Sequence, residues 1–327
     1  MKAQRGVALI TVLLVVAIVT VICAGMIARQ QLSIRGTGNQ LQARQAWHYA
    51  LGGEALAQTL LRRDLRLSGE GTGQPAVDHL LEAWALPQPA YDLDEGQGQV
   101  QVRIEDLAGR FNLNSLVQEQ QPNAAALAQF RRLLLRLQIT EPYGERLVDW
   151  LDSDQQPSGE FGAEDNDYLL LDPPYRTAGR RLEDLSELRL LLGMRDEDFQ
   201  RLAPYVTALP ADTPLNVNTA SALVLSSLAD SLSPSAAESL VQTRQAAPFR
   251  DTASFMAQPA LSGVQLQSTN LAVTSQFFQA ISEVRLADRR LALVSRLRRE
   301  DDGDVRVLQR NLGQPPRLPR PTNDGDR

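Results

Sequence analysis

A long uncharged segment near the start of the chain, residues 7–28, constrains the fold more than any other feature. At about 1.5 Å per residue, a helix of this length measures roughly 33 Å, enough to cross the hydrocarbon core of a bilayer. The apolar part of a secretory signal peptide is usually shorter, about 7–15 residues, and has a small-x-small cleavage site after it. No such site follows here, so we expect a membrane-spanning helix. Lys2 and Arg5 place the N-terminus in the cytoplasm and the rest of the chain outside.

The helical pattern does not end at the membrane. Residues 29–67 keep helix-forming composition, and apolar side chains recur at a helical spacing. We therefore expect one helix of about 55–60 residues, half membrane span and half amphipathic. Glycines at 36, 38, 52 and 53 allow local kinks. The apolar residues expected on the buried face are Leu41, Trp47, Leu51, Leu56, Leu60 and Leu61.

Two distant regions have the alternation of half-buried strands. In residues 98–106 the side chains of Val100, Val102 and Ile104 fall on one face. The segments 277–300 and 304–312 also read as strands, joined by the turn sequence DDGD. We expect these strands to form one sheet, with everything between them inserted into it.

The insert contains an internal repeat. FNLNSL at 111–116 is matched by LNVNTA at 215–220, and ITEPYGERLVDW at 139–150 is matched by LSPSAAESLVQT at 232–243. The repeat predicts a helical domain with two related halves, similar to the helix-hairpin-helix class. The expected helix N-caps are Ser115, Thr219, Thr140 and Ser233.

A membrane-anchored helix-hairpin-helix DNA receptor is therefore the alternative function. DNA-binding hairpins expose backbone N–H groups to phosphate through a glycine turn, and the matched turns here contain no glycine. The net charge is −6, and Asp230 in one turn would repel phosphate. Arg131, Arg132 and Arg136 do form a small basic group. We favour a structural or protein-binding domain.

An acidic stretch, residues 149–172, lies between the two halves. It contains eight carboxylates and no Lys or Arg, interleaved with apolar side chains that should make it pack. A hard divalent cation such as Ca²⁺, which takes six to eight oxygen ligands, would relieve the repulsion. The alternatives are a solvated acidic loop and, least favoured, a paired-carboxylate hydrolase. The candidate metal ligands are Asp149, Asp152, Asp154, Glu164, Asp165 and Asp167.

The chain has few of the histidine and cysteine residues on which many enzymes depend. The chain has two histidines, His48 and His79, and one cysteine, Cys23, which lies inside the apolar segment. These numbers argue against Ser-His-Asp or Cys-His catalysis and against a histidine-rich zinc site. They also exclude an intramolecular disulfide. We expect a protein that is not an enzyme.

Four segments together resemble the K-type minor pseudopilins of type II secretion systems, the general secretion pathway protein K family. They are the basic leader with its apolar helix, GQVQVRIEDLAGRFNLNSL at 98–116, LVDWLDSD at 147–154 with the acidic residues after it, and LNVNTA at 215–220. In this family a similar acidic stretch belongs to a calcium-binding helical domain, so the resemblance implies a structural Ca²⁺ here.

The resemblance also implies processing of the N-terminus. A prepilin peptidase would cut after Gly6 and methylate Val7. Pseudopilins usually have a glutamate where this chain has Thr11, and a buried carboxylate there needs a cationic partner from the subunit above. Thr11 thus implies a subunit with no other above it, at the tip of a pseudopilus. An unprocessed anchor is the alternative.

The implied fold is α+β: a long N-terminal helix packed on a small antiparallel sheet, with a large all-α domain, similar to SAM and helix-hairpin-helix domains, inserted into the sheet. The expected parts are a cytoplasmic leader (1–6), a transmembrane segment (7–28), the pseudopilin helix and first strands (29–110), an inserted domain (111–273), C-terminal strands (274–312) and a disordered Pro-rich tail (313–327).

The resemblance implies a role in assembly. The chain would initiate or cap a pseudopilus that supports protein export across the outer membrane. The implied partners are the I- and J-type minor pseudopilins, other pseudopilins and the prepilin peptidase, and no nucleic acid. The expected location is the inner membrane, with a single span and most of the chain in the periplasm.

Overall fold

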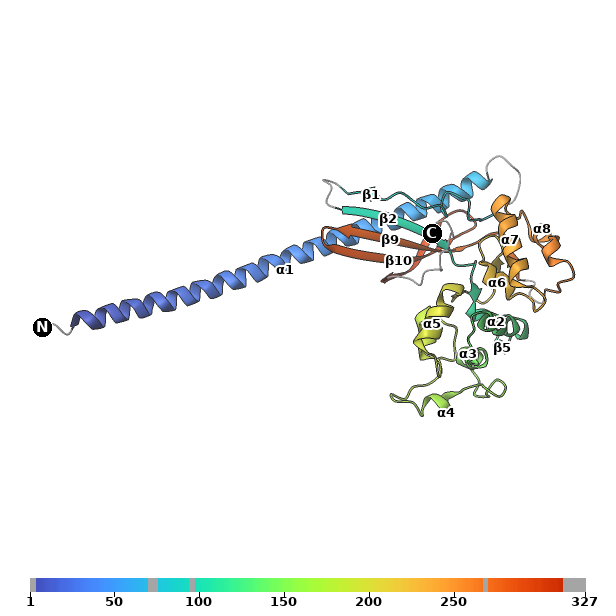
Figure 1. Ribbon diagram of the computed structural model, residues 1–327, viewed down its shortest axis with the longest axis horizontal. Helices are drawn as coiled ribbons and strands as arrows, with labels where there is room; N and C mark the ends of the chain where they lie inside the picture. Colours follow the sequence, from blue (N-terminus) through green and yellow to red (C-terminus); the bar gives the residue numbers. More distant parts are fainter. Residues whose placement is uncertain (1–3, 70–75, 94–97, 267–269, 314–327) are drawn as a thin grey trace, which may run out of the picture.

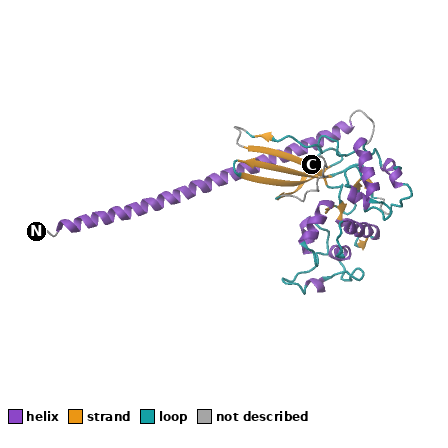
Figure 2. Cartoon of the chain, viewed as in Figure 1, coloured by secondary structure: helices purple, strands orange, loops and turns teal. Residues whose placement is uncertain are grey.

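The computed structural model describes residues 4–69, 76–93, 98–266 and 270–313. The start of the expected leader and all but one residue of the expected Pro-rich tail lie outside these ranges. The described chain forms three parts: a long helix, a five-stranded sheet at one end of that helix, and an inserted domain beyond the sheet (Figures 1 and 2).

The first part is the helix α1, Gln4–Gly69, which runs for 66 residues without a break at its glycines. Its N-terminal half projects away from the rest of the molecule (Figure 1). The helical segment Ala8–Leu67 is long and apolar enough to cross a membrane, and its most apolar part is not buried against the rest of the chain. Burial starts near Ala46, so the expected place of Leu41 on the buried face is wrong: that side chain is 58% exposed.

The second part is an antiparallel sheet of order β1-β2-β9-β10-β11, as expected from the two distant strand regions. The segment 277–300 forms two strands, because a tight turn at Ala287 and Asp288 reverses the chain within it. The sequence pattern did not predict this hairpin. The strands are β1 Tyr91–Asp92, β2 Gly98–Asp106, β9 Phe277–Leu286, β10 Arg289–Arg299 and β11 Val305–Leu312.

The C-terminal part of α1 packs on one face of this sheet. Val100, Val102 and Ile104 of β2 point toward the helix and are buried with Phe278 and Trp84, as the alternation predicted. Gly53 lets α1 lie close to the sheet, because a Cβ atom at this position would be only 2.5 Å from Ser282 Oγ.

The third part, residues 107–276, is inserted between β2 and β9 and has its own hydrophobic core. Short 3-10 turns connect its helices, and the likeness to SAM and helix-hairpin-helix domains stays a prediction. The helices are α2 Ala124–Arg136, α3 Tyr143–Leu151, α4 Asp165–Tyr168, α5 Asp196–Leu202, α6 Ala222–Ser226, α7 Pro234–Ala246 and α8 Thr252–Met256.

The insert is not all-α as predicted, because short strands close each of its halves. β3 Phe111–Asn112 pairs in parallel with β6 Val206–Thr207, and β7 Leu215–Asn216 pairs in parallel with β8 Leu271–Ala272. Each half thus ends beside its own beginning. A small hairpin, β4 Val117–Gln118 with β5 Gln121–Pro122, lies in the first half.

The repeated asparagines perform the same task in both halves. Asn114 donates to the carbonyl of Leu182 and accepts from its N–H, and Asn218 does the same with Phe249. The first asparagine of each motif accepts from the backbone N–H of the second. These amides replace a strand partner for buried backbone groups. The repeat in the sequence is therefore a repeat of structure.

Three of the four expected N-caps are wrong. Asn112, Asn123 and Ser221 cap the segments that follow the two motifs, so Ser115 and Thr219 do not. The helix near Thr140 begins after Pro142, without a side-chain cap. Ser233 caps α7 as expected. Because a motif with several adjacent polar residues offers several caps, the register of the backbone decides which one is used.

Candidate metal centre

The acidic stretch runs from the last turn of α3 through the loop that follows to just beyond α4, at the end of the insert farthest from the sheet (Figure 1). α3 ends at its C-cap residue Asp152, and α4 follows its N-cap residue Glu164, whose backbone N–H donates to Asp167. The two helix ends thus bring Asp152 and Glu164 together, and the loop between them supplies Asp154.

These three carboxylates form the candidate site. Each of Asp152, Asp154 and Glu164 has an oxygen within 4.8 Å of the others. Asp152 and Glu164 are each 3% exposed. Asp152 Oδ1 and both Glu164 oxygens are buried without a hydrogen-bond partner. Buried polar atoms are nearly always satisfied, so three converging oxygens without a donor are the kind of group that a cation could bind.

The electrostatics agree with the geometry. Burial raises the pKa of Glu164 to about 7, and repulsion from Asp149 and Asp152 adds to the rise. Burial and the charge of Asp154 raise the pKa of Asp152 to about 6. A divalent cation would favour the ionised form of both groups.

The other three predicted ligands already have donors, and they shape the loop. Asp149 is fully buried and accepts from the N–H groups of Ser158 and Ala163, at 2.9 and 2.7 Å. Asp165 accepts from Thr177 and Arg176. Asp167 accepts from the N–H of Glu164 at 3.0 Å. Gly162 lies so close that a Cβ atom there would be 2.4 Å from Asp149 Oδ2.

Aromatic side chains support the loop from inside. Trp150, Tyr168 and Tyr175 pack together, with ring centroids 5.3 to 6.4 Å apart. The two ends of the loop, which carry Asp152 and Glu164, are therefore packed and buried. The residues between them, 153–157 and 159–161, are exposed, including Phe161, which was expected to pack. The residues present fit a hard oxygen-ligated ion such as Ca²⁺, whose remaining ligands would be backbone carbonyls or water.

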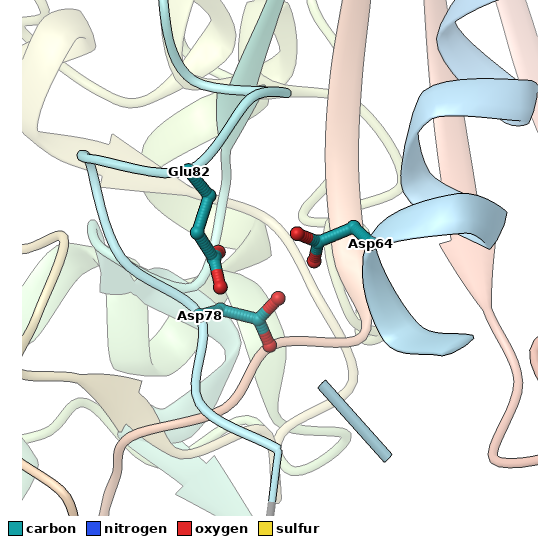
Figure 3. Close-up of side chains that lie close together, drawn as sticks. All are labelled: Asp64, Asp78 and Glu82. Carbon is teal, nitrogen blue, oxygen red and sulfur yellow. The ribbon is translucent and has the colours of Figure 1, made fainter. Parts of the chain in front are cut away.

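A second carboxylate cluster escaped the sequence analysis. Asp64 from α1 and Asp78 and Glu82 from the following loop point toward one another (Figure 3), with oxygens within 4.8 Å. Here Arg299 supplies a cation and every carboxylate has a donor. No sequence pattern predicts this cluster, because its residues belong to α1, to the loop after it and to the distant strand β10.

The N-terminal positions lie in α1. Gly6, Val7 and Thr11 all fall within its first turns. The Thr11 hydroxyl donates to the carbonyl of Ala8 at 2.9 Å, within the helix.

The three arginines that could have bound DNA phosphate already have partners within the insert. Arg131 pairs with Glu145, and Arg132 contacts Asp230 and the carbonyls of Ser227 and Leu228. Arg136 donates to the carbonyl of Leu232. Arg131 thus joins α2 to α3, and the other two join α2 to the segment between α6 and α7, which counts against a phosphate-binding surface here.

Comparisons with known proteins agree on one family. Two family models, both described as type II secretion system (T2SS) protein K, match residues 109–211 and 215–274, close to the two halves of the insert. The chain is 52% identical to the type II secretion system protein K of Pseudomonas aeruginosa, over 99% of this chain and 97% of the relative. It is 36% identical to that of Klebsiella pneumoniae, over 95% and 97%.

A solved structure has the same fold. The crystal structure of the GspK-GspI-GspJ complex from the type 2 secretion system of enterotoxigenic Escherichia coli contains a chain that matches with a TM-score of 0.74 and 29% identity. The match covers 85% of the present chain and 99% of the other.

Proposed function

The chain belongs to the type II secretion system protein K family, and we propose that it is a minor pseudopilin at the tip of the pseudopilus. There it would initiate or cap assembly and so support protein export. The observation that carries this proposal is the position of the insert, which covers the end of the molecule opposite to the exposed apolar helix (Figure 1). A subunit of this shape can join others through its helix and leaves little room above.

The exposed half of α1 needs an apolar environment. Leu9, Ile18, Val21 and Met26 are each at least 50% exposed, and leaving such side chains in water is unfavourable. Lipid would cover them before assembly, and partner helices afterwards. The basic residues before the span favour a cytoplasmic N-terminus and a periplasmic sheet and insert.

The partners we propose are the I- and J-type minor pseudopilins, because the similar structure is a complex of three such proteins. Thr11 fits this position. Its hydroxyl has an acceptor within α1, so it does not require the cationic partner that a buried carboxylate would.

We also propose that the acidic loop holds a structural Ca²⁺ through Asp152, Asp154 and Glu164. The ion would neutralise the buried carboxylates and connect the ends of α3 and α4. This chain forms no internal disulfide, and a metal ion would close the long loop in its place.

The first test is the mass of the N-terminus of the protein purified from its own membrane. We expect a chain that begins at N-methylated Val7 and co-purifies with the I- and J-type subunits. Gly6→Ala should leave the leader in place and abolish secretion, while Gly25→Ala, further along the same apolar helix, should be processed normally. An intact leader on a protein that still supports secretion would overturn the proposal.

A further inference from the structure

The second carboxylate cluster lies where the insert joins the sheet. Arg299, at the end of β10, is 4% exposed and donates to both oxygens of Asp78 at 2.5 and 2.6 Å. It also reaches Asp64, near the end of α1, at 3.3 Å. Its third acceptor is the carbonyl of Ser275, which belongs to the segment that returns from the insert to β9. One guanidinium thus joins the helix, the sheet and the insert.

Ser275 extends the network to the end of β2. Its backbone N–H donates to Asp78 at 2.7 Å, and its hydroxyl donates to Asp106 at 2.6 Å. Asn216 and Thr219, from the LNVNTA motif, also donate to Asp106, at 3.1 and 2.5 Å. The chain enters the insert just after Asp106 and leaves it just after Ser275, so this network spans both connections.

The charges at this junction do not balance. Among the described residues, Asp64 of α1, Asp78 and Glu82 of the loop and Asp106 of β2 surround one cation, Arg299 of β10. A second guanidinium, that of the buried Arg110, also acts on Asp106, but its own ion pair is with Glu105 at 2.6 Å. His79, next to Glu82 at 3.7 Å, is a further titratable neighbour. With all four carboxylates ionised, the junction would hold an excess of buried negative charge, which is strongly unfavourable.

We propose that these four carboxylates and Arg299 form a proton-controlled clamp, which holds the insert to the sheet more firmly in mild acid than at neutral pH. Each proton taken up removes one repulsive charge and leaves the hydrogen bonds around Arg299 in place. The clamp would thereby couple the position of the insert to the pH around the protein.

The pKa directions give the sign of the effect. Burial raises the pKa of Asp64 and of Asp106 to about 6 and that of Glu82 to about 8, and repulsion from neighbouring carboxylates adds to each rise. Their unfolded values lie near 4. The stability they contribute is therefore present at low pH and is lost as the pH rises through about 6 to 8. Burial also raises the pKa of Asp78. Burial lowers the pKa of His79, so this one group opposes the effect of the four carboxylates.

Hydrogen exchange of the full-length chain in detergent tests the clamp, with excess Ca²⁺ so that the acidic loop stays fixed. The reporters are peptides that cover 76–86 and 270–280, measured at pH 5.5 and 7.5 and corrected for intrinsic exchange. We expect protection there to rise about tenfold or more in acid. Peptides from the centre of β9 and β10 should change little.

Asp64→Asn identifies the carboxylates as the cause. This variant lacks one ionisable group, so it should raise protection at pH 7.5 and reduce the pH dependence about fourfold. Asp304→Asn is the matched control, because Asp304 pairs with Arg62 of α1 outside the cluster and its pKa is lowered. If Asp64→Asn fails to fold, Glu82→Gln is the variant to use in its place, because glutamine keeps an oxygen that can accept from Trp84.

Two results would overturn the clamp. Protection at the junction that is equal at both pH values, or lower in acid, contradicts the proposed sign. A pH dependence of Asp64→Asn and Glu82→Gln that matches the unmodified chain would mean that other groups cause it.

Discussion

At the scale of single residues, an aspartate can stabilise a loop or be available to bind a metal ion, depending on its neighbours. Asp149 and Asp152 come from one stretch of sequence, and both are buried. Asp149 accepts two backbone N–H groups and holds the loop, whereas Asp152 has an oxygen without any donor. The number of donors within reach, and not the residue type, separates a structural carboxylate from a candidate ligand.

This difference predicts how the acidic loop responds to calcium. Removing Ca²⁺ with a chelator should destabilise the unmodified protein by about 2–3 kcal/mol relative to a calcium concentration a hundredfold above Kd. Asp152→Asn with Asp154→Asn should abolish that gain, yet be at least as stable as the unmodified chain in chelator, because like charges are removed. Thermal unfolding with and without calcium measures both effects.

Asp172→Asn is the matched control, since Asp172 belongs to the same acidic stretch and is exposed. It should keep the full response to calcium. If the double variant loses the same stability in chelator as in calcium, the loop is merely solvated and the metal proposal fails.

At the scale of elements, the contact between α1 and the sheet depends on close approach at one position. Gly52 and Gly53 are adjacent in α1, but a Cβ atom at Gly52 would meet nothing within 4 Å. At Gly53 it would lie 2.5 Å from Ser282 Oγ and 3.0 Å from Val102 Cγ2. Ser282 and Val102 are buried in the sheet and cannot move aside easily.

The two glycines therefore predict opposite effects of one substitution. Gly52→Ala should stabilise the protein by about 0.5–1 kcal/mol, because alanine favours the helix. Gly53→Ala should destabilise it by about 1–3 kcal/mol, because the helix must shift away from the sheet. Urea unfolding of the two variants beside the unmodified chain checks this. Equal effects of both changes would contradict the packing described here.

At the scale of the whole molecule, two hydrophobic cores lie side by side with a narrow connection. One core fills the insert and the other lies between α1 and the sheet. Leu107, Leu209 and Phe277 form a third, small cluster where the insert meets the sheet. Asp106 and Phe278 are paired in neighbouring strands, so the two ends of the insert lie close together. The insert can thus be removed without separating β2 from β9.

Removal of the insert tests its proposed role as a block. A chain in which a short glycine-serine linker replaces 107–276 should keep the helix and the sheet and still co-purify with the I- and J-type subunits. It should also crosslink to the major pseudopilin along the pseudopilus, and secretion should fall. If the shortened chain still crosslinks only at the tip, the bulk of the insert is not what limits stacking.

Periodicity and spacing by themselves determined the long helix, the half-buried strand β2 and the two-part organisation of the insert. The uncharged run predicted the helix, and the alternation at Val100, Val102 and Ile104 predicted a strand. The paired Asn-x-Asn motifs predicted two related halves. These signals are local, because the side-chain periods of helices and strands are fixed by backbone geometry. The density of carboxylates likewise pointed to the acidic loop.

Tertiary structure alone decided what those residues do. Which carboxylates converge depends on where α3 and α4 end, and which polar residue caps a helix depends on backbone register. The parallel pairs that close each half and the cluster of Asp64, Asp78 and Glu82 around Arg299 join residues far apart in the chain. Such contacts carry no spacing signal, because only the packed fold brings their partners within bonding distance.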